Sequence, residues 1–159
     1  MPFDAAHLHL MVNHFPVVLS VVGLASLVVG AVWRRDFYWR AGLNLMVLAG
    51  IAAVVAILTG ESAESEIRLR AFVVPGTIGA HSSAAYAALW ALLVSGAIAA
   101  FAWWRARASD VMALPAWLRE LVLISALAGV ALVSYAAYRG GIIVQDAPVL
   151  QTLKTPAAP

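Results

Sequence analysis

Four long apolar stretches, separated by short polar segments, make up most of the chain. They cover about residues 8–33, 39–59, 78–104 and 117–139, and each is near the roughly 20 residues that a helix needs to cross a bilayer. Backbone polar groups in lipid must pair within their own segment, so uninterrupted runs of this length predict helices. The pattern predicts an all-α fold, an up-and-down bundle of four transmembrane helices. It forms a single domain over residues 1–159, with a tail at 145–159.

The polar segment between the second and third apolar stretches has a helical pattern of its own. Glu64 and Arg68, like Glu66 and Arg70, are four residues apart with the acid first, a spacing that stabilises exposed helices. Gly60 precedes this pattern and is typical of a helix end. We therefore expect the second span to stop at Gly60 and a short amphipathic helix to follow on the membrane surface.

The composition agrees with a membrane protein and excludes several classes of site. Of 159 residues, 64% are hydrophobic and 11% are charged, and cysteine is absent. The lack of cysteine excludes disulfides, iron–sulfur clusters and thiolate metal sites. The sequence has neither a nucleotide-binding loop nor a hydrolase motif, which favours a redox or structural subunit over an enzyme acting alone. The centres of the spans hold no charged residue, which disfavours a transporter.

The arginines predict an orientation. Six of them lie within the polar segments 34–40 and 105–120, which share one side of the membrane: Arg34, Arg35, Arg40, Arg105, Arg107 and Arg119. The opposite side holds four basic residues, Arg68, Arg70, Arg139 and Lys154. The positive-inside rule then places the arginine-rich segments in the cytoplasm. We expect a multi-pass protein of a bacterial inner membrane with both termini in the periplasm.

All four histidines fall on the predicted periplasmic side. His7, His9 and His14 precede the first apolar run, and His81 precedes the third. His14 and His81 lie at nearly the same depth on helices that are diagonal partners in such a bundle. Two imidazoles that face each other at one height suit the axial positions of haem iron. The sequence therefore predicts one haem b with His14 and His81 as axial ligands. His9 is expected to point away from this pair, toward water, or to be an interfacial residue that hydrogen-bonds a neighbour or caps a helix.

A haem with two axial protein ligands has no open coordination position, which suits electron transfer. The expected route runs between quinol, or the cofactor of a partner subunit, and a periplasmic carrier. Cations for the haem propionates would come from Arg68, Arg70 and Arg139. Two alternatives stay open: a cofactor-free structural subunit of a membrane complex, and a zinc or copper site. The metal site would use His7, His9, His14, His81, Glu61 and Glu64.

Four short motifs occur in order along nearly the whole chain. They are "HLHLMVNHFPVV", "ILTGESAES", "GAHSSAA" and "YRGGII". With these motifs the chain resembles the bacterial membrane family catalogued as domain of unknown function 2231, whose layout is similar to that of four-helix b-type cytochromes. Two features depart from the family pattern. The residues around His81 are Gly79, Ala80, Ser82 and Ser83 instead of acids, and no histidine follows the paired glycines, where Val144 and Gln145 stand. The second departure argues against a second haem.

Overall fold

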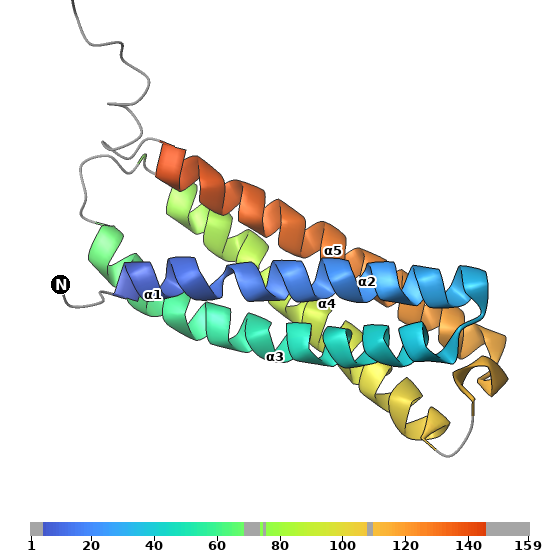
Figure 1. The fold of residues 1–159 in the computed structure, drawn as a ribbon. Helices are drawn as coiled ribbons and strands as arrows, with labels where there is room; N and C mark the ends of the chain where they lie inside the picture. Colours follow the sequence, from blue (N-terminus) through green and yellow to red (C-terminus); the bar gives the residue numbers. More distant parts are fainter. Residues whose placement is uncertain (1–4, 69–73, 75, 108–109, 146–159) are drawn as a thin grey trace, which may run out of the picture.

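The protein is described by a computed structural model that covers residues 5–68, 74, 76–107 and 110–145. Helices make up nearly all of this part (Figure 1). In chain order they are α1 (Ala5–Val12), α2 (His14–Trp33), α3 (Asp36–Ile67), α4 (Thr77–Ala106), the short 3₁₀ helix η1 (Val111–Ala113) and α5 (Ala116–Gln145).

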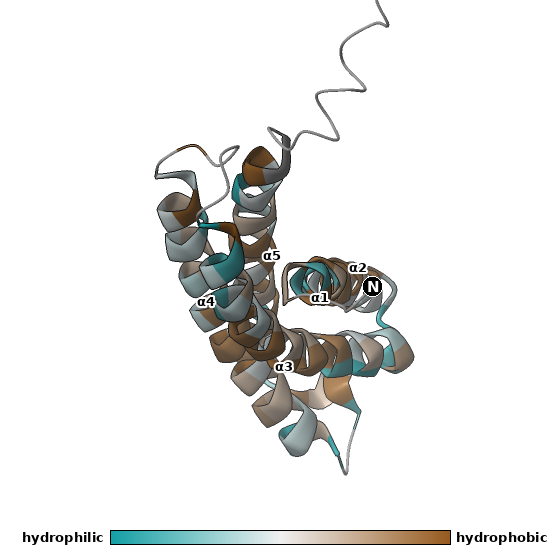
Figure 2. Cartoon of the chain, turned by 90° about the vertical axis from the view of Figure 1, so that its left-hand side faces the viewer, coloured by the Kyte–Doolittle hydropathy of each residue, from teal (hydrophilic) through white to brown (hydrophobic). Residues whose placement is uncertain are grey.

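Four rods in this structure are long and apolar enough to cross a membrane. They are Ala5–Trp33, which joins α1 and α2, then α3, α4 and the α5 segment Ala116–Ile143. Figure 2 shows that hydrophobic residues dominate these rods. Many large apolar side chains face outward, among them Val32 at 70% exposure and Ile124 at 66%, as expected of a lipid-facing surface. The prediction of an all-helical, four-span bundle is confirmed.

The first rod is only slightly interrupted between α1 and α2. Asn13 lies at the junction with right-handed helical backbone angles, φ −63° and ψ −18°, and its side chain makes no capping hydrogen bond. Pro16 follows in the first turn of α2, where the missing N–H of proline removes no helical bond. The helix before His14 therefore continues the direction of the span and carries His9 along it.

Consecutive rods pack side by side in an antiparallel arrangement (Figure 1). α2 packs on α3, α3 on α4 and α4 on α5, while α5 also contacts α2 and α1 packs mainly on α3. One end of the bundle holds the start of α1, the end of α3, the start of α4 and the end of α5, and we name it the histidine end. The opposite end, which we name the arginine end, holds the remaining helix termini and η1.

The expected stop at Gly60 and the separate surface helix after it are wrong for the residues that the structure describes. α3 runs without a break to Ile67, so the stretch 60–67 extends the second span. Glu64 and Arg68 do form the predicted ion pair, in the last turn of α3 and at its cap. Arg70 lies outside the described residues. Gly60 lies inside α3, and the imidazole of His9 packs against it.

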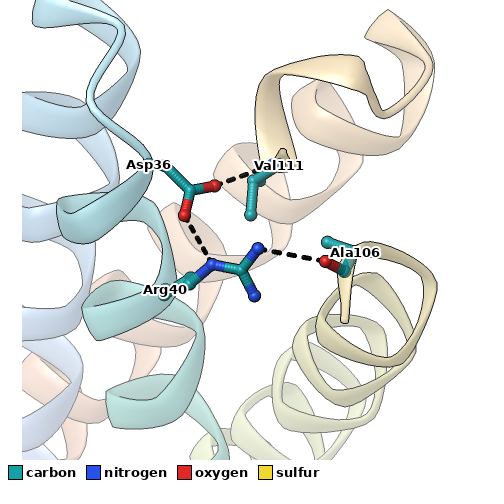
Figure 3. A network of polar contacts seen from close by, with 4 residues as sticks. All are labelled: Asp36, Arg40, Ala106 and Val111. Atoms are coloured by element: carbon teal, nitrogen blue, oxygen red, sulfur yellow. Dashed lines mark hydrogen bonds and ion pairs between the residues drawn. The ribbon is translucent and has the colours of Figure 1, made fainter. Parts of the chain in front are cut away.

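A polar network holds the arginine end together (Figure 3). The Asp36 carboxylate lies 2.5 Å from Nε of Arg40 and accepts a hydrogen bond of 2.8 Å from the backbone N–H of Val111. Arg40 Nη2 donates to the carbonyl oxygen of Ala106 at 3.0 Å. Two side chains thus connect the start of α3 with the end of α4 and with η1.

Candidate functional site

A cavity of about 580 Å³ lies among the helices at the histidine end. α1, α2, α3, α4 and α5 all contribute to its wall, which is mainly apolar and rich in alanine. Ionisable and amide side chains are few, and they come from every rod except α5: His9, Asn13, His14, Glu61, Glu64, His81 and Tyr86. The cavity therefore gathers three of the four histidines in one place.

His81 projects from the second turn of α4 and is half-buried. Its Nδ1 lies 3.0 Å from the carbonyl oxygen of Ala136 in α5. A carbonyl only accepts hydrogen bonds, so Nδ1 must carry the proton. In the neutral ring the lone pair is then on Nε2, and that nitrogen is the one available to a ligand.

His9 is half-buried as well, so it does not point toward water, and it hydrogen-bonds a neighbouring helix as the other interpretation expects. Its Nδ1 lies 3.2 Å from Oγ1 of Thr59 in α3. The Thr59 hydroxyl is also 3.0 Å from the carbonyl oxygen of Val55 and 3.1 Å from that of Ala56. When the hydroxyl donates to one of these carbonyls, Oγ1 accepts the Nδ1 proton of His9 and the lone pair of the ring is on Nε2.

His14 and His7 are both exposed, and only one of them belongs to the cavity. His14 lines the wall, and its Nδ1 lies 2.8 Å from the carbonyl oxygen of Leu10, one turn earlier in the same rod. His7 is not among the lining residues. The structure therefore brings together the predicted pair of His14 and His81, adds His9 to them, and leaves His7 outside.

The two acids predicted as alternative metal ligands also line the cavity, and each has a partner. Glu61 accepts a hydrogen bond from the hydroxyl of Tyr86, which joins α3 to α4. Glu64 pairs with Arg68. Within the described ranges no three histidine, aspartate or glutamate side chains come close enough to hold a metal ion. Of the alternative set, His9, Glu61 and Glu64 line the cavity and His7 does not.

The arginines expected to contact propionates lie at the right end of the bundle but outside the cavity wall. Arg68 caps α3 and is largely exposed, and Arg139 lies next to Gly140 on α5. Neither is among the residues that line the cavity. Arg70 falls outside the residues that the structure describes.

Asn13 is a cavity residue that the sequence reasoning missed as a site residue. Its Oδ1 is buried and has no hydrogen-bond partner in the described part of the chain. Asn13 follows His9 by four residues, so the two share a face wherever the helix is nearly continuous. This spacing of four residues is the feature of the sequence that could have placed Asn13 beside His9. An unpaired amide in an otherwise apolar wall marks a place for a polar group of a ligand.

Comparison with known proteins identifies the family. Residues 5–152 match the family model described as predicted membrane protein, DUF2231. No curated protein and no solved structure matches the chain significantly. The match covers all four rods and every residue that lines the cavity, and it confirms the resemblance carried by the four motifs. The chain therefore belongs to the DUF2231 family of predicted membrane proteins.

Proposed function

We propose that the cavity holds one haem b and that the protein transfers electrons through it. His81 supplies one axial imidazole, and a histidine of the first rod, His14 or His9, supplies the other. The observation that carries this proposal is the convergence of imidazoles from separate rods on one apolar cavity, each with Nδ1 engaged and Nε2 left for iron.

The number of protein ligands favours haem over a bare metal ion. Protein zinc sites use three or four side chains, whereas the described residues offer no such group. A haem brings four equatorial nitrogens in its ring and needs only two axial ligands. The cavity volume of about 580 Å³ falls within the roughly 300–1,000 Å³ typical of cofactor pockets, and an alanine-rich wall suits a flat apolar ring.

The hydrogen bonds of the histidines support a role as metal ligands. A ligating histidine usually donates its other ring N–H to a carbonyl, carboxylate or water, which fixes the ring and raises its basicity. His81 and His14 both donate to backbone carbonyls. The amide oxygen of Asn13, which has no partner in the described residues, could accept a hydrogen bond from a polar edge of the cofactor.

Two axial imidazoles leave haem iron without an open position, so the role is electron transfer and not oxygen chemistry. One haem near one membrane face does not carry electrons across the bilayer. The protein therefore works beside partner subunits, between quinol or a partner's cofactor and a periplasmic carrier. The arginine end would face the cytoplasm of a bacterial cell, because six of the nine arginines lie at that end and basic residues favour the cytoplasmic side.

The visible spectrum of the purified protein tests this proposal. We expect sharp reduced-minus-oxidised bands of a b-type haem in the detergent-solubilised protein and their loss in His81→Ala. His7→Ala is the matched control, since His7 is exposed and lies outside the cavity wall, and it should keep the bands. A featureless spectrum from a helical, monodisperse preparation would overturn the haem proposal. Stoichiometric zinc or copper in that preparation would then identify a metal protein, and no metal would identify a scaffold.

A further inference from the structure

The ring of His81 lies directly against a glycine of the next helix. A Cβ atom added at Gly140 of α5 would be 2.9 Å from Cε1 and 3.2 Å from Nδ1 of His81. Side-chain atoms do not approach within 3.0 Å of a real Cβ, so any other residue at position 140 must displace the ring. Ala136, whose carbonyl holds Nδ1, lies one turn earlier on the same helix. We name this combination of glycine and acceptor a glycine seat.

His9 has a second glycine seat, on α3. A Cβ atom at Gly60 would be 3.0 Å from Cε1 and 3.4 Å from Nδ1 of His9. The neighbouring Thr59 supplies the acceptor for Nδ1. Each of the two imidazoles thus comes from one rod and is held in position by the next, and the Ala136 carbonyl also fixes the tautomer of His81.

The two seated rings form a matched pair that does not include His14. His9 and His81 are both half-buried in the cavity wall and close enough to interact electrostatically. His14 is exposed and is held only by Leu10 of its own rod. No glycine in the described part of the chain has His14 among its nearest atoms. A ligand must be held in one geometry, and the second-layer contacts that do so are present for His9 and His81.

The four sequence motifs meet in pairs at these seats. "HLHLMVNHFPVV" contains His9, which contacts Thr59 and Gly60 of "ILTGESAES". "GAHSSAA" contains His81, which contacts Gly140 of "YRGGII". From this pairing we infer that His9 and His81 are the two axial ligands, with Gly60 and Gly140 as positioning residues. The inference rests on the proposed haem function, and it assigns to His9 the ligand role that the sequence analysis predicts for His14.

Hemin titration of the purified protein in detergent tests the assignment of ligands. His9→Gly and His81→Gly should each convert the six-coordinate low-spin spectrum to a five-coordinate one, and added imidazole should restore the low-spin bands by filling the space of the lost ring. His14→Ala should keep the low-spin spectrum. Helicity by circular dichroism shows for each variant that the fold is retained.

The glycine seats are tested without removing any histidine. Gly60→Ala and Gly140→Ala should weaken hemin binding roughly tenfold or more, as loss of second-layer support does in metal sites. Gly79→Ala is the matched control, because an added Cβ there meets no atom within 4 Å and Gly79 is not among the residues that line the cavity. This variant should bind hemin like the unmodified protein.

The outcomes separate this inference from the proposed function. If His9→Gly keeps the low-spin spectrum and His14→Ala loses it, the axial ligands are His14 and His81. The proposed haem function would then stand, and the assignment of His9 would be wrong. An unmodified protein that binds no hemin would reject the haem function itself. In that case ¹⁵N NMR of labelled histidine at alkaline pH measures the tautomers of His9 and His81 in the unmodified protein. An Nε2–H tautomer of either ring would contradict the proposed glycine seats.

Discussion

The two ends of the bundle are built from the same helices and differ in how their interior is filled. At the arginine end large side chains close the core, including Trp39 at 2% exposure and Leu43 at 0%, and Gly30 brings the backbone of Trp39 close to α2. At the histidine end many of the inward positions are alanine or glycine, and a cavity of about 580 Å³ remains. The hollow beside Trp39 at the arginine end is much smaller, about 160 Å³, so the large cavity is a local property of the histidine end.

The polar groups differ between the ends in the same way. α3 begins with the ion pair of Asp36 and Arg40 and ends with that of Glu64 and Arg68. The outermost charge of each pair, Asp36 at the start and Arg68 at the end, suits the helix dipole. Asp36 and Arg40 also bond to η1 and α4. The pair of Glu64 and Arg68 joins two residues of the same helix. Glu64 also lines the cavity. Polar side chains thus tie helices together at one end and line an open space at the other.

The largest expected effect comes from adding volume on α4 at the two ends. Ala99 is 1% exposed and belongs to the packed core, so Ala99→Leu should destabilise the protein by about 1–3 kcal/mol, as overpacking does. Ala85 lines the cavity, so Ala85→Leu should cost less stability while it blocks hemin. Thermal unfolding in detergent and hemin titration measure the two effects. Equal destabilisation by both substitutions would show that the two ends are packed alike.

A smaller loss is expected when the network at the arginine end is broken. Asp36→Ala removes the acceptor for Arg40 and for the N–H of Val111. Hydrogen bonds to a charged group contribute about 1.5–3 kcal/mol when well buried, and the Asp36 side chain is 35% exposed, so we expect about 1 kcal/mol in total. Chemical unfolding in detergent measures the change.

Glu120→Gln is the control for Asp36→Ala, since it neutralises an exposed carboxylate on α5 at the same end. It should leave the unfolding midpoint unchanged. Hemin binding should stay intact in both variants because the cavity lies at the far end. A loss of hemin binding in Asp36→Ala would show that the ends are coupled.

The sequence was sufficient for the layout of the bundle. Long apolar runs must be helices in lipid, and their order fixes which termini share an end, so the gathering of His14 and His81 at one end followed from chain direction alone. The rotation of each helix about its axis did not follow. A helix that is apolar on every side has no stripe that marks its inner face, and for this reason His9 could be expected to point toward water although it lies in the cavity wall.

Glycine was the second source of error. Gly60 has the sequence context of a helix end, with a threonine before it and acids after it, and it was interpreted in that way. In the structure Gly60 is inside α3 and accommodates the ring of His9. A glycine that ends a helix and one that admits a neighbouring ring look the same in a single sequence, because both are defined by an absent side chain. Only the contact across helices separates them.

The smallest expected effect belongs to the ion pair at the histidine end. Arg68→Gln removes a partner of Glu64 that is 69% exposed, and an exposed pair at this spacing contributes at most about 0.5 kcal/mol. The loss should shrink further in high salt, which screens exposed charges. Unfolding midpoints at low and high ionic strength measure both quantities. A loss as large as that of Asp36→Ala would mean that Arg68 joins several elements as Arg40 does. The two ends would then be held by equivalent polar networks and differ only in the volume that their side chains fill.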